Sequence, residues 1–80
     1  MSEHQLDARN ILCPLPVIRT QNAVQNLNKG DVLTVTCTDP GAMNDIPMWS
    51  RINGHKVLTM QNDNDVIQIS IEVEGLESEL

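Results

Sequence analysis

Apolar and polar residues alternate strictly in two segments of the chain, and these segments are the most direct guide to its structure. Over residues 31–38, Leu33, Val35 and Cys37 alternate with polar or smaller positions, three of which are threonine. Over residues 66–73, the apolar positions form the unbroken series Ile67, Ile69, Ile71 and Val73. A period of two places neighbouring side chains on opposite faces of a strand. Both segments are therefore predicted to be strands with one buried face.

A helical period, rather than an alternating one, is found in the segment that precedes the first of these strands. From Pro14 to Asn28, one stripe at a spacing of 3.6 residues carries Val17, Thr20, Val24 and Leu27. Polar residues occupy the opposite side of the same segment. This pattern predicts an amphipathic helix, which the Lys29-Gly30 pair ends.

A second helix is predicted between the two alternating strands, from about Asp45 to a stop at Asn53-Gly54. An earlier start is disfavoured because the ring of Pro47 would clash with the carbonyl group of Met43 inside a continuous helix. We therefore expect an irregular turn over residues 40–44, followed by a helix with Asp45 as its N-cap and Pro47 in its first turn.

Two weaker strand patterns complete the order of elements. Residues 5–9 alternate, and residues 56–60 precede a polar loop at 61–65 that should join them to the last strand in an antiparallel hairpin. A strand, a helix and a strand in succession form a right-handed unit with parallel strands. The chain is therefore predicted to be an α/β two-layer sandwich of order β-α-β-α-β-β, with a four-stranded mixed sheet and both helices on one face.

The length of the chain limits this architecture to a single domain. Eighty residues suffice for one small core, and the patterns place the ordered part at about 5–73, ahead of an acidic C-terminal tail at 74–80. Apolar residues make up 40% of the chain, yet Phe and Tyr are absent and Trp49 is the only aromatic residue. The core must therefore be built from aliphatic side chains.

The charge of the chain argues against direct binding of nucleic acid. Eleven acidic residues against five basic ones give a formal charge of −6, whereas nucleic-acid affinity depends on Lys and Arg. No apolar run approaches the ~20 residues of a membrane span, and the N-terminus lacks the pattern of a signal peptide. We expect a cytoplasmic protein without a membrane partner, in which Cys13 and Cys37 are reduced thiols.

Cys13 is the candidate reactive residue because it stands directly before a predicted helix. Proline suits the first helical position, so Pro14 is expected there and Cys13 is expected to be the N-cap. The positive end of the helix dipole then favours the thiolate, and we expect the pKa of Cys13 to lie below that of a free cysteine. The alternative is a small buried residue at a turn. Cys37, on the apolar face of its strand, is interpreted as a core residue.

Three residues early in the first helix lie beside Cys13. Leu15 and Ile18 fall off the buried stripe, so they either pack on a neighbouring loop or form an apolar collar that a partner protein covers. Arg19 offers a contact to an acidic partner, although surface arginines usually do no more than solvate.

Two further kinds of site are weighed against a reactive Cys13. A zinc site from both cysteines, His4 and His55 is disfavoured because their spacing matches no common ligand pattern, so no metal is expected. Both histidines are expected to be solvated. A redox sensor at Cys13 would lack a resolving cysteine on an evident neighbouring loop.

The chain contains a set of short motifs, which are Leu6-Asp7-Ala8, Leu12-Cys13-Pro14-Leu15-Pro16-Val17, Lys29-Gly30-Asp31, Asp39-Pro40, Asp45-Ile46-Pro47 and Gly54-His55. In this order and spacing, over about residues 5–73, the chain resembles the TusA/SirA family of sulfur-carrier proteins. The family often has glycine where Asn10 stands, and asparagine also tolerates left-handed backbone.

The resemblance implies a function for Cys13. The corresponding cysteine of the family accepts sulfur as a persulfide from a cysteine desulfurase and hands it to the next protein in a relay, which in the TusA branch leads to the 2-thiouridine of tRNA. Pro14, Pro16, Asp45 and Pro47 belong to the supporting motifs. Such an exchange needs an exposed thiolate but no cofactor. The alternative is a non-catalytic regulatory or interaction module of the same fold.

Overall fold

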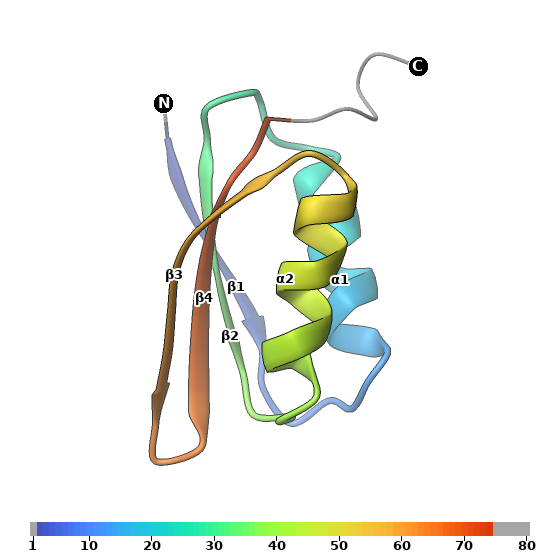
Figure 1. The fold of residues 1–80 in the computed structure, drawn as a ribbon, viewed down its shortest axis with the longest axis vertical. Helices are drawn as coiled ribbons and strands as arrows, with labels where there is room; N and C mark the ends of the chain where they lie inside the picture. Colours follow the sequence, from blue (N-terminus) through green and yellow to red (C-terminus); the bar gives the residue numbers. More distant parts are fainter. Residues whose placement is uncertain (1, 75–80) are drawn as a thin grey trace.

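The computed structural model describes residues 2–74 and consists of a sheet and a pair of helices (Figure 1). The predicted acidic tail lies outside the described residues after Glu74. The six elements follow the predicted order and are β1 (Glu3–Ala8), α1 (Leu15–Val24), β2 (Val32–Cys37), α2 (Ala42–Ile52), β3 (Lys56–Asp63) and β4 (Val66–Glu72).

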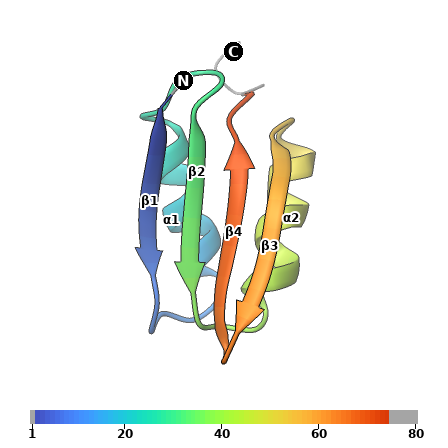
Figure 2. The same ribbon diagram turned by 90° about the vertical axis from the view of Figure 1, so that its left-hand side faces the viewer.

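The sheet has the strand order β1-β2-β4-β3 and is mixed. β1 runs parallel to β2, whereas β4 runs antiparallel to both of its neighbours. Figure 2 looks onto the open face of the sheet and shows both helices behind it. The predicted two-layer α/β sandwich with two helices on one face is therefore confirmed.

The core lies between the sheet and the helices and is aliphatic, as the composition requires. It forms because the alternating positions of β2 and β4 meet across the ladder, where Val35 pairs with Ile69 and Leu33 with Ile71. Cys37 has no exposed surface and belongs to this core, as predicted. The buried apolar residues are Ala8, Val24, Leu33, Val35, Cys37, Ala42, Ile46, Ile67, Ile69, Ile71 and Val73.

The first helix is shorter than predicted at both ends, but its stripe is correct. Thr20 and Val24 are buried, whereas Val17 and Leu27 are partly buried. The hydroxyl of Thr20 donates to the carbonyl oxygen of Pro16 at 2.8 Å, which satisfies a polar group inside the core. After the helix the chain turns at Gly30, whose φ of 94° glycine adopts without strain.

The second helix begins earlier than predicted. It starts at Ala42 with Gly41 as its N-cap, so Asp45 lies in its first turn and Pro47 lies inside it. The sequence-based assignment of Asp45 as the cap, after an irregular turn over residues 40–44, is therefore wrong. Gly54, with a φ of 82°, ends the helix as predicted.

The first residues of α2 wind more tightly than an α-helix. The N–H groups of Ala42, Met43 and Asn44 each donate to the carbonyl three residues back, a pattern common at helix ends. Pro47 contributes no N–H, but its side chain is buried with the core-facing side of the helix. Tertiary packing thus compensates for the missing backbone hydrogen bond.

The hairpin is longer and tighter than predicted. β3 extends to Asp63, so only Asn64 and Asp65 form the turn, and both have positive φ, of 53° and 67°. Such two-residue turns match the twist of paired strands. The expected loop over 61–65 is therefore mostly strand.

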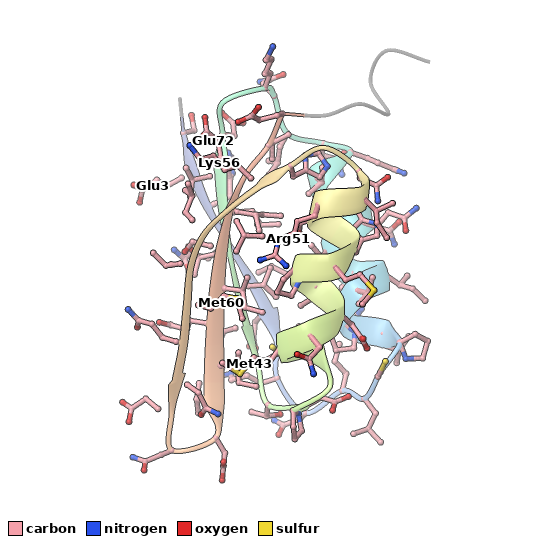
Figure 3. All side chains as sticks on the ribbon, in the orientation of Figure 1. Glu3, Met43, Arg51, Lys56, Met60 and Glu72 are labelled. Carbon is pink, nitrogen blue, oxygen red and sulfur yellow. The ribbon has the colours of Figure 1, made fainter. Side chains whose placement is uncertain are left out.

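Figure 3 shows side chains from both layers. Met43 of α2 packs on the core, and Met60 of β3 stands opposite Ile69, which is also a core residue. Lys56 and Glu72 face each other across the last two strands. The apolar covered face of the sheet thus extends onto β3 at Met60, which is partly exposed at this edge.

His55 differs from its prediction as a solvated residue. It is 4% exposed, its ring lies 5.3 Å from the ring of Trp49, and its Nδ1 accepts the backbone N–H of Glu74 at 3.1 Å. The first residue after the helix-stop glycine therefore helps to fix the end of the described chain. His4 is partly exposed, and its Nε2 lies 3.4 Å from an oxygen of Asp31.

Candidate functional site

The candidate site lies where both helices begin. Because α1 and α2 each follow a strand of the same direction, their N-termini lie at the same end of the sheet (Figure 1). Two loops meet there, one before each helix. The backbone N–H of Asn10 donates to the hydroxyl of Thr38 at 2.9 Å, and the N–H of Cys13 donates to Oδ2 of Asp39. These bonds hold the loop of Cys13 against the start of α2.

Asn10 provides the sharp change of direction that leads to Cys13. Its φ is 65°, in the left-handed region that asparagine tolerates better than most residues. The expectation that Asn10 can replace a glycine at this turn is confirmed.

Cys13 is exposed, but it is not the N-cap of α1. The helix begins one residue later than predicted: Pro14 occupies the cap position, Leu15 is the first helical residue, and no side chain caps the helix. The Cys13-Pro14 peptide bond is cis. Pro16 is buried in the first turn, whereas Pro14 is exposed.

The sulfur of Cys13 contacts a carboxylate on the other helix. Its Sγ donates a hydrogen bond to Oδ2 of Asp45, at 2.9 Å. This bond, together with burial and the negative charges of Asp45 and Asp39, raises the pKa of the Cys13 thiol above its ordinary value. The expectation of a lowered pKa is therefore wrong for the free protein, because Asp45, rather than the helix N-terminus, is the partner of the sulfur.

Asp39 stabilises the backbone on both sides of this contact. Its Oδ1 accepts the N–H of Gly41 at 2.9 Å, and its Oδ2 accepts the N–H of Cys13. The aspartate binds backbone N–H groups, as capping side chains do, whereas the cysteine does not.

The collar residues are exposed, as one of the two sequence interpretations requires. Leu15 and Ile18 are each 44% exposed, and Leu12, on the other side of Cys13, is 74% exposed. Arg19 is exposed too, and it forms no ion pair with any residue in the range 2–74. The structure adds Leu12 to the collar that was expected from Leu15 and Ile18, and these three residues, called the apolar collar from here on, do not pack into the core.

Two apolar residues of α2 were missed as candidates. Met48 is 57% exposed and Ile52 is 72% exposed. Asp45, Met48 and Ile52 are three and four residues apart and therefore lie on one face of α2. That i, i+3, i+7 pattern was visible in the sequence. Its exposure was not, because packing against the sheet, which buries Ile46 of the same helix, decides which face is covered.

Other groups considered from the sequence do not join Cys13. Among residues 2–74, no three His, Cys, Asp or Glu side chains form a group that could hold a metal ion. Within the same range, no helix is long and apolar enough to cross a membrane.

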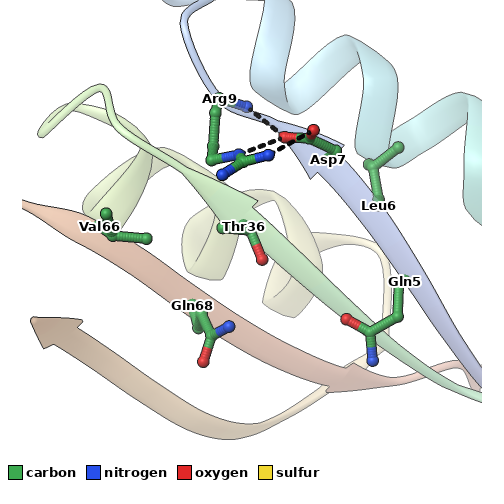
Figure 4. Close-up of a pocket in the computed structure, with 7 residues that line it drawn as sticks. All are labelled: Gln5, Leu6, Asp7, Arg9, Thr36, Val66 and Gln68. Carbon is green, nitrogen blue, oxygen red and sulfur yellow. Dashed lines mark hydrogen bonds and ion pairs between the residues drawn. The ribbon is translucent and has the colours of Figure 1, made fainter.

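A separate hollow lies on the open face of the sheet (Figure 4). It measures about 370 Å³ and is lined mainly by polar side chains of three strands, with an Asp7–Arg9 ion pair of 2.9 Å at one side. The Arg9 guanidinium lowers the pKa of Asp7 to about 2. Cys13 is not among the residues that line this hollow, so the two features are distinct.

Comparison with known proteins defines the class of this fold and site. The family described as sulfurtransferase TusA matches residues 4–73, and the chain therefore belongs to the TusA family. The resemblance inferred from the sequence motifs is confirmed.

Relatives from several bacteria cover almost the whole chain. YrkI of Bacillus subtilis, a proposed sulfur carrier protein, is 38% identical over 71 residues, which are 89% of this chain and 95% of YrkI. YedF of Escherichia coli, also a proposed sulfur carrier, is 34% identical and covers 88% of this chain and 91% of its own. The crystal structure of a SirA-like protein from Desulfitobacterium hafniense has a TM-score of 0.77, with 28% identity over 86% of this chain and 95% of that protein.

Proposed function

We propose that this protein is a sulfur carrier in which Cys13 accepts sulfur as a persulfide from a cysteine desulfurase and delivers it to an acceptor protein. The observation that carries the proposal is the position of Cys13, an exposed thiol at the meeting point of two helix starts in a TusA-family chain. Cys37 has no exposed surface and is therefore not a candidate for the same role.

The exchange balances without a cofactor or an external oxidant. The Cys13 sulfur attacks the outer sulfur of a donor persulfide, the new sulfur–sulfur bond forms as the donor's bond breaks, and the donor cysteine leaves as a thiolate. The proton that Cys13 loses ends on that thiolate. The products are a persulfide on Cys13 and a reduced thiol on the donor, and delivery to the acceptor repeats the step in the other direction.

A carrier of this kind works by contact with other proteins, and the surface around Cys13 suits that role. The apolar collar leaves aliphatic side chains exposed on both sides of the thiol. Leu15 and Ile18, with Arg19 beside them, are proposed to contact the sulfur donor. Removing apolar surface from water at such a contact contributes to binding.

Synthesis of 2-thiouridine in tRNA is the proposed destination of the sulfur. The formal charge of −6 disfavours tight contact between this protein and RNA. We therefore assign the binding of tRNA to a later protein of the relay and not to this one.

A non-catalytic module of the same fold is the second candidate. It is favoured by one observation, namely that Asp45 raises the pKa of the Cys13 thiol and so reduces its thiolate fraction at neutral pH. Slow alkylation of the free protein would therefore not separate a carrier from a module with an inactive cysteine.

Sulfur loading separates the two candidates. The protein is incubated with a cysteine desulfurase and cysteine, and its mass is then measured without reductant. A carrier gains one sulfur atom in the wild type and in Cys37→Ser, but gains none in Cys13→Ser. Loading on Cys37 alone, or no loading of any variant by desulfurases tested, contradicts the proposal.

A further inference from the structure

Asp45 is the side chain in contact with the Cys13 sulfur, and the contact has a direct chemical consequence. Its Oδ2 lies 2.9 Å from Sγ. A carboxylate has no proton to donate at neutral pH, so the sulfur must be the donor in this hydrogen bond. The bond therefore exists only while Cys13 is a thiol. Loss of the thiol proton would leave two negative charges in contact.

The surroundings of the sulfur do not relieve this repulsion. The charged groups that act on Sγ are Asp45 of α2 and Asp39 of the preceding loop, and no cation of residues 2–74 is among them. A methyl group placed on Gly41 would lie 3.4 Å from Oδ1 of Asp39 and 3.9 Å from Oδ2 of Asp45. Both carboxylates thus border the same small space next to Cys13.

We infer that Asp45 is a positioning residue that holds the Cys13 sulfur as a protonated thiol, turned toward α2, until positive charge is brought beside it. This inference rests on the proposed function, since it assigns the control of the exchange at Cys13 to Asp45. The free carrier is then slow toward small neutral electrophiles. A donor that presents a cationic side chain next to Asp45 removes the repulsion and frees the sulfur to attack.

The raised pKa of Cys13 supports the same interpretation, because the hydrogen bond from the thiol to Asp45 is its largest cause. The exchange itself remains balanced as written above. Asp45 forms no bond to sulfur and is not consumed. It sets only how readily Sγ releases the proton that the donor thiolate finally receives.

The first test measures alkylation of Cys13 by iodoacetamide, a neutral reagent, in a Cys37→Ala background. Asp45→Asn keeps the size of the side chain, removes its charge and offers an N–H to the sulfur. We expect alkylation at neutral pH to become about three- to tenfold faster and the midpoint of its pH profile to fall. Asp7→Asn is the matched control, since it removes one charge on the open face of the sheet and should leave both quantities unchanged.

The second test uses two methanethiosulfonate reagents that react at sulfur, as a persulfide does, and differ in charge. The reagent with a trimethylammonium group should modify Cys13 faster than the one with a sulfonate group. The ratio of the two rates should fall in Asp45→Asn and remain in Asp7→Asn. Added salt should lower the ratio in the unsubstituted Asp45 protein as well, a readout that depends on no variant at Asp45.

Several results would overturn the inference. One is that Asp45→Asn is alkylated no faster than its parent. A slower rate would indicate that Asp45 acts as a base for Cys13. Another is a reagent ratio that neither Asp45→Asn nor salt changes. None of these measurements uses a desulfurase, so a failure of sulfur loading with the expected alkylation results would reject the proposed function and leave the role of Asp45 intact.

Discussion

The two cysteines of this protein show how strongly position decides the chemistry of one side chain. Cys37 stands on the covered face of β2 and has no exposed surface, whereas Cys13 lies in a loop at the helix starts and is exposed. Both thiols have a raised pKa, but for different reasons: burial is the main cause for Cys37, and the hydrogen bond to Asp45 is the main cause for Cys13. The thiol of Cys37 is therefore inaccessible, whereas the thiol of Cys13 is accessible but held by its hydrogen bond to Asp45.

The difference matters because only the restraint on Cys13 can be removed without unfolding. Access to Cys37 requires separation of the sheet from the helices, which costs much of the stability of a small domain. Access to Cys13 requires only a change in one hydrogen bond at the surface. This restraint by Asp45 could not be predicted from the sequence, where the position of Asp45 in its motif indicated only a helix start.

The largest effect that we predict is the difference in reactivity between the two thiols in the native protein. Cys37 should react with iodoacetamide about a thousandfold or more slowly than Cys13, because it is reached only through opening of the core. Peptide mass mapping after timed alkylation measures both rates. In concentrated guanidinium chloride the two rates should converge, and comparable native rates would show that Cys37 is not sealed in the core.

The same comparison extends to the neighbours of the two cysteines. Leu33→Ala, on the same covered face of β2 as Cys37, should lower the free energy of unfolding by ~2–5 kcal/mol because it leaves a cavity. Leu15→Ala and Ile18→Ala should each cost less than ~1 kcal/mol, since these side chains are already half solvated. Urea unfolding followed by Trp49 fluorescence provides the three values.

The collar variants also test the proposed docking surface. Leu15→Ala and Ile18→Ala should slow sulfur loading from the desulfurase while the fold is kept. If Ile18→Ala loses several kcal/mol of stability, or if both variants load at the full rate, then these residues serve packing and the donor binds elsewhere.

Replacing each cysteine by serine gives a smaller contrast. Cys37→Ser should cost ~1–3 kcal/mol, because it puts a hydroxyl group among aliphatic side chains. Cys13→Ser should change stability by less than ~0.5 kcal/mol, since its oxygen is exposed and can still donate to Asp45. Thermal unfolding of the two variants beside the wild type measures the difference, and equal losses would contradict the contrast.

The smallest effect concerns alkaline pH. A group whose pKa is raised in the folded state contributes stability that is complete below its unfolded pKa and is lost as pH rises toward the folded value. Wild-type stability should therefore decline above pH 9.0, the ordinary value for cysteine, and Cys37→Ala should decline less steeply. Tyrosine is absent from the chain and does not add to this range. Parallel pH curves for the two proteins would exclude a contribution from Cys37.

Most of the fold could be predicted from the sequence, because its elements depend on local periodicity. The alternation around Val35 and Ile69 identified both central strands and their buried faces, and the stripe through Thr20 and Val24 identified the inner side of the first helix. Cys37 was assigned to the core for the same reason. These patterns repeat over several residues, so an error at one position changes little.

Boundaries and partners were less predictable, because they depend on contacts between distant segments. A local rule for proline delayed the predicted start of α2 to Asp45, whereas the packed helix begins at Ala42 and includes Pro47. His55, expected in solvent, is covered by Trp49.

The sequence by itself determined that this chain forms a two-layer α/β sandwich with one candidate thiol ahead of the first helix. Composition, periodicity and motif order can all be read along the chain. Only the tertiary structure decided what that thiol contacts. Cys13 and Asp45 are separated by 32 positions and meet because two parallel helices start at the same end of the sheet. The protonation state of a side chain depends on such neighbours in space, and a spacing along the chain does not specify them.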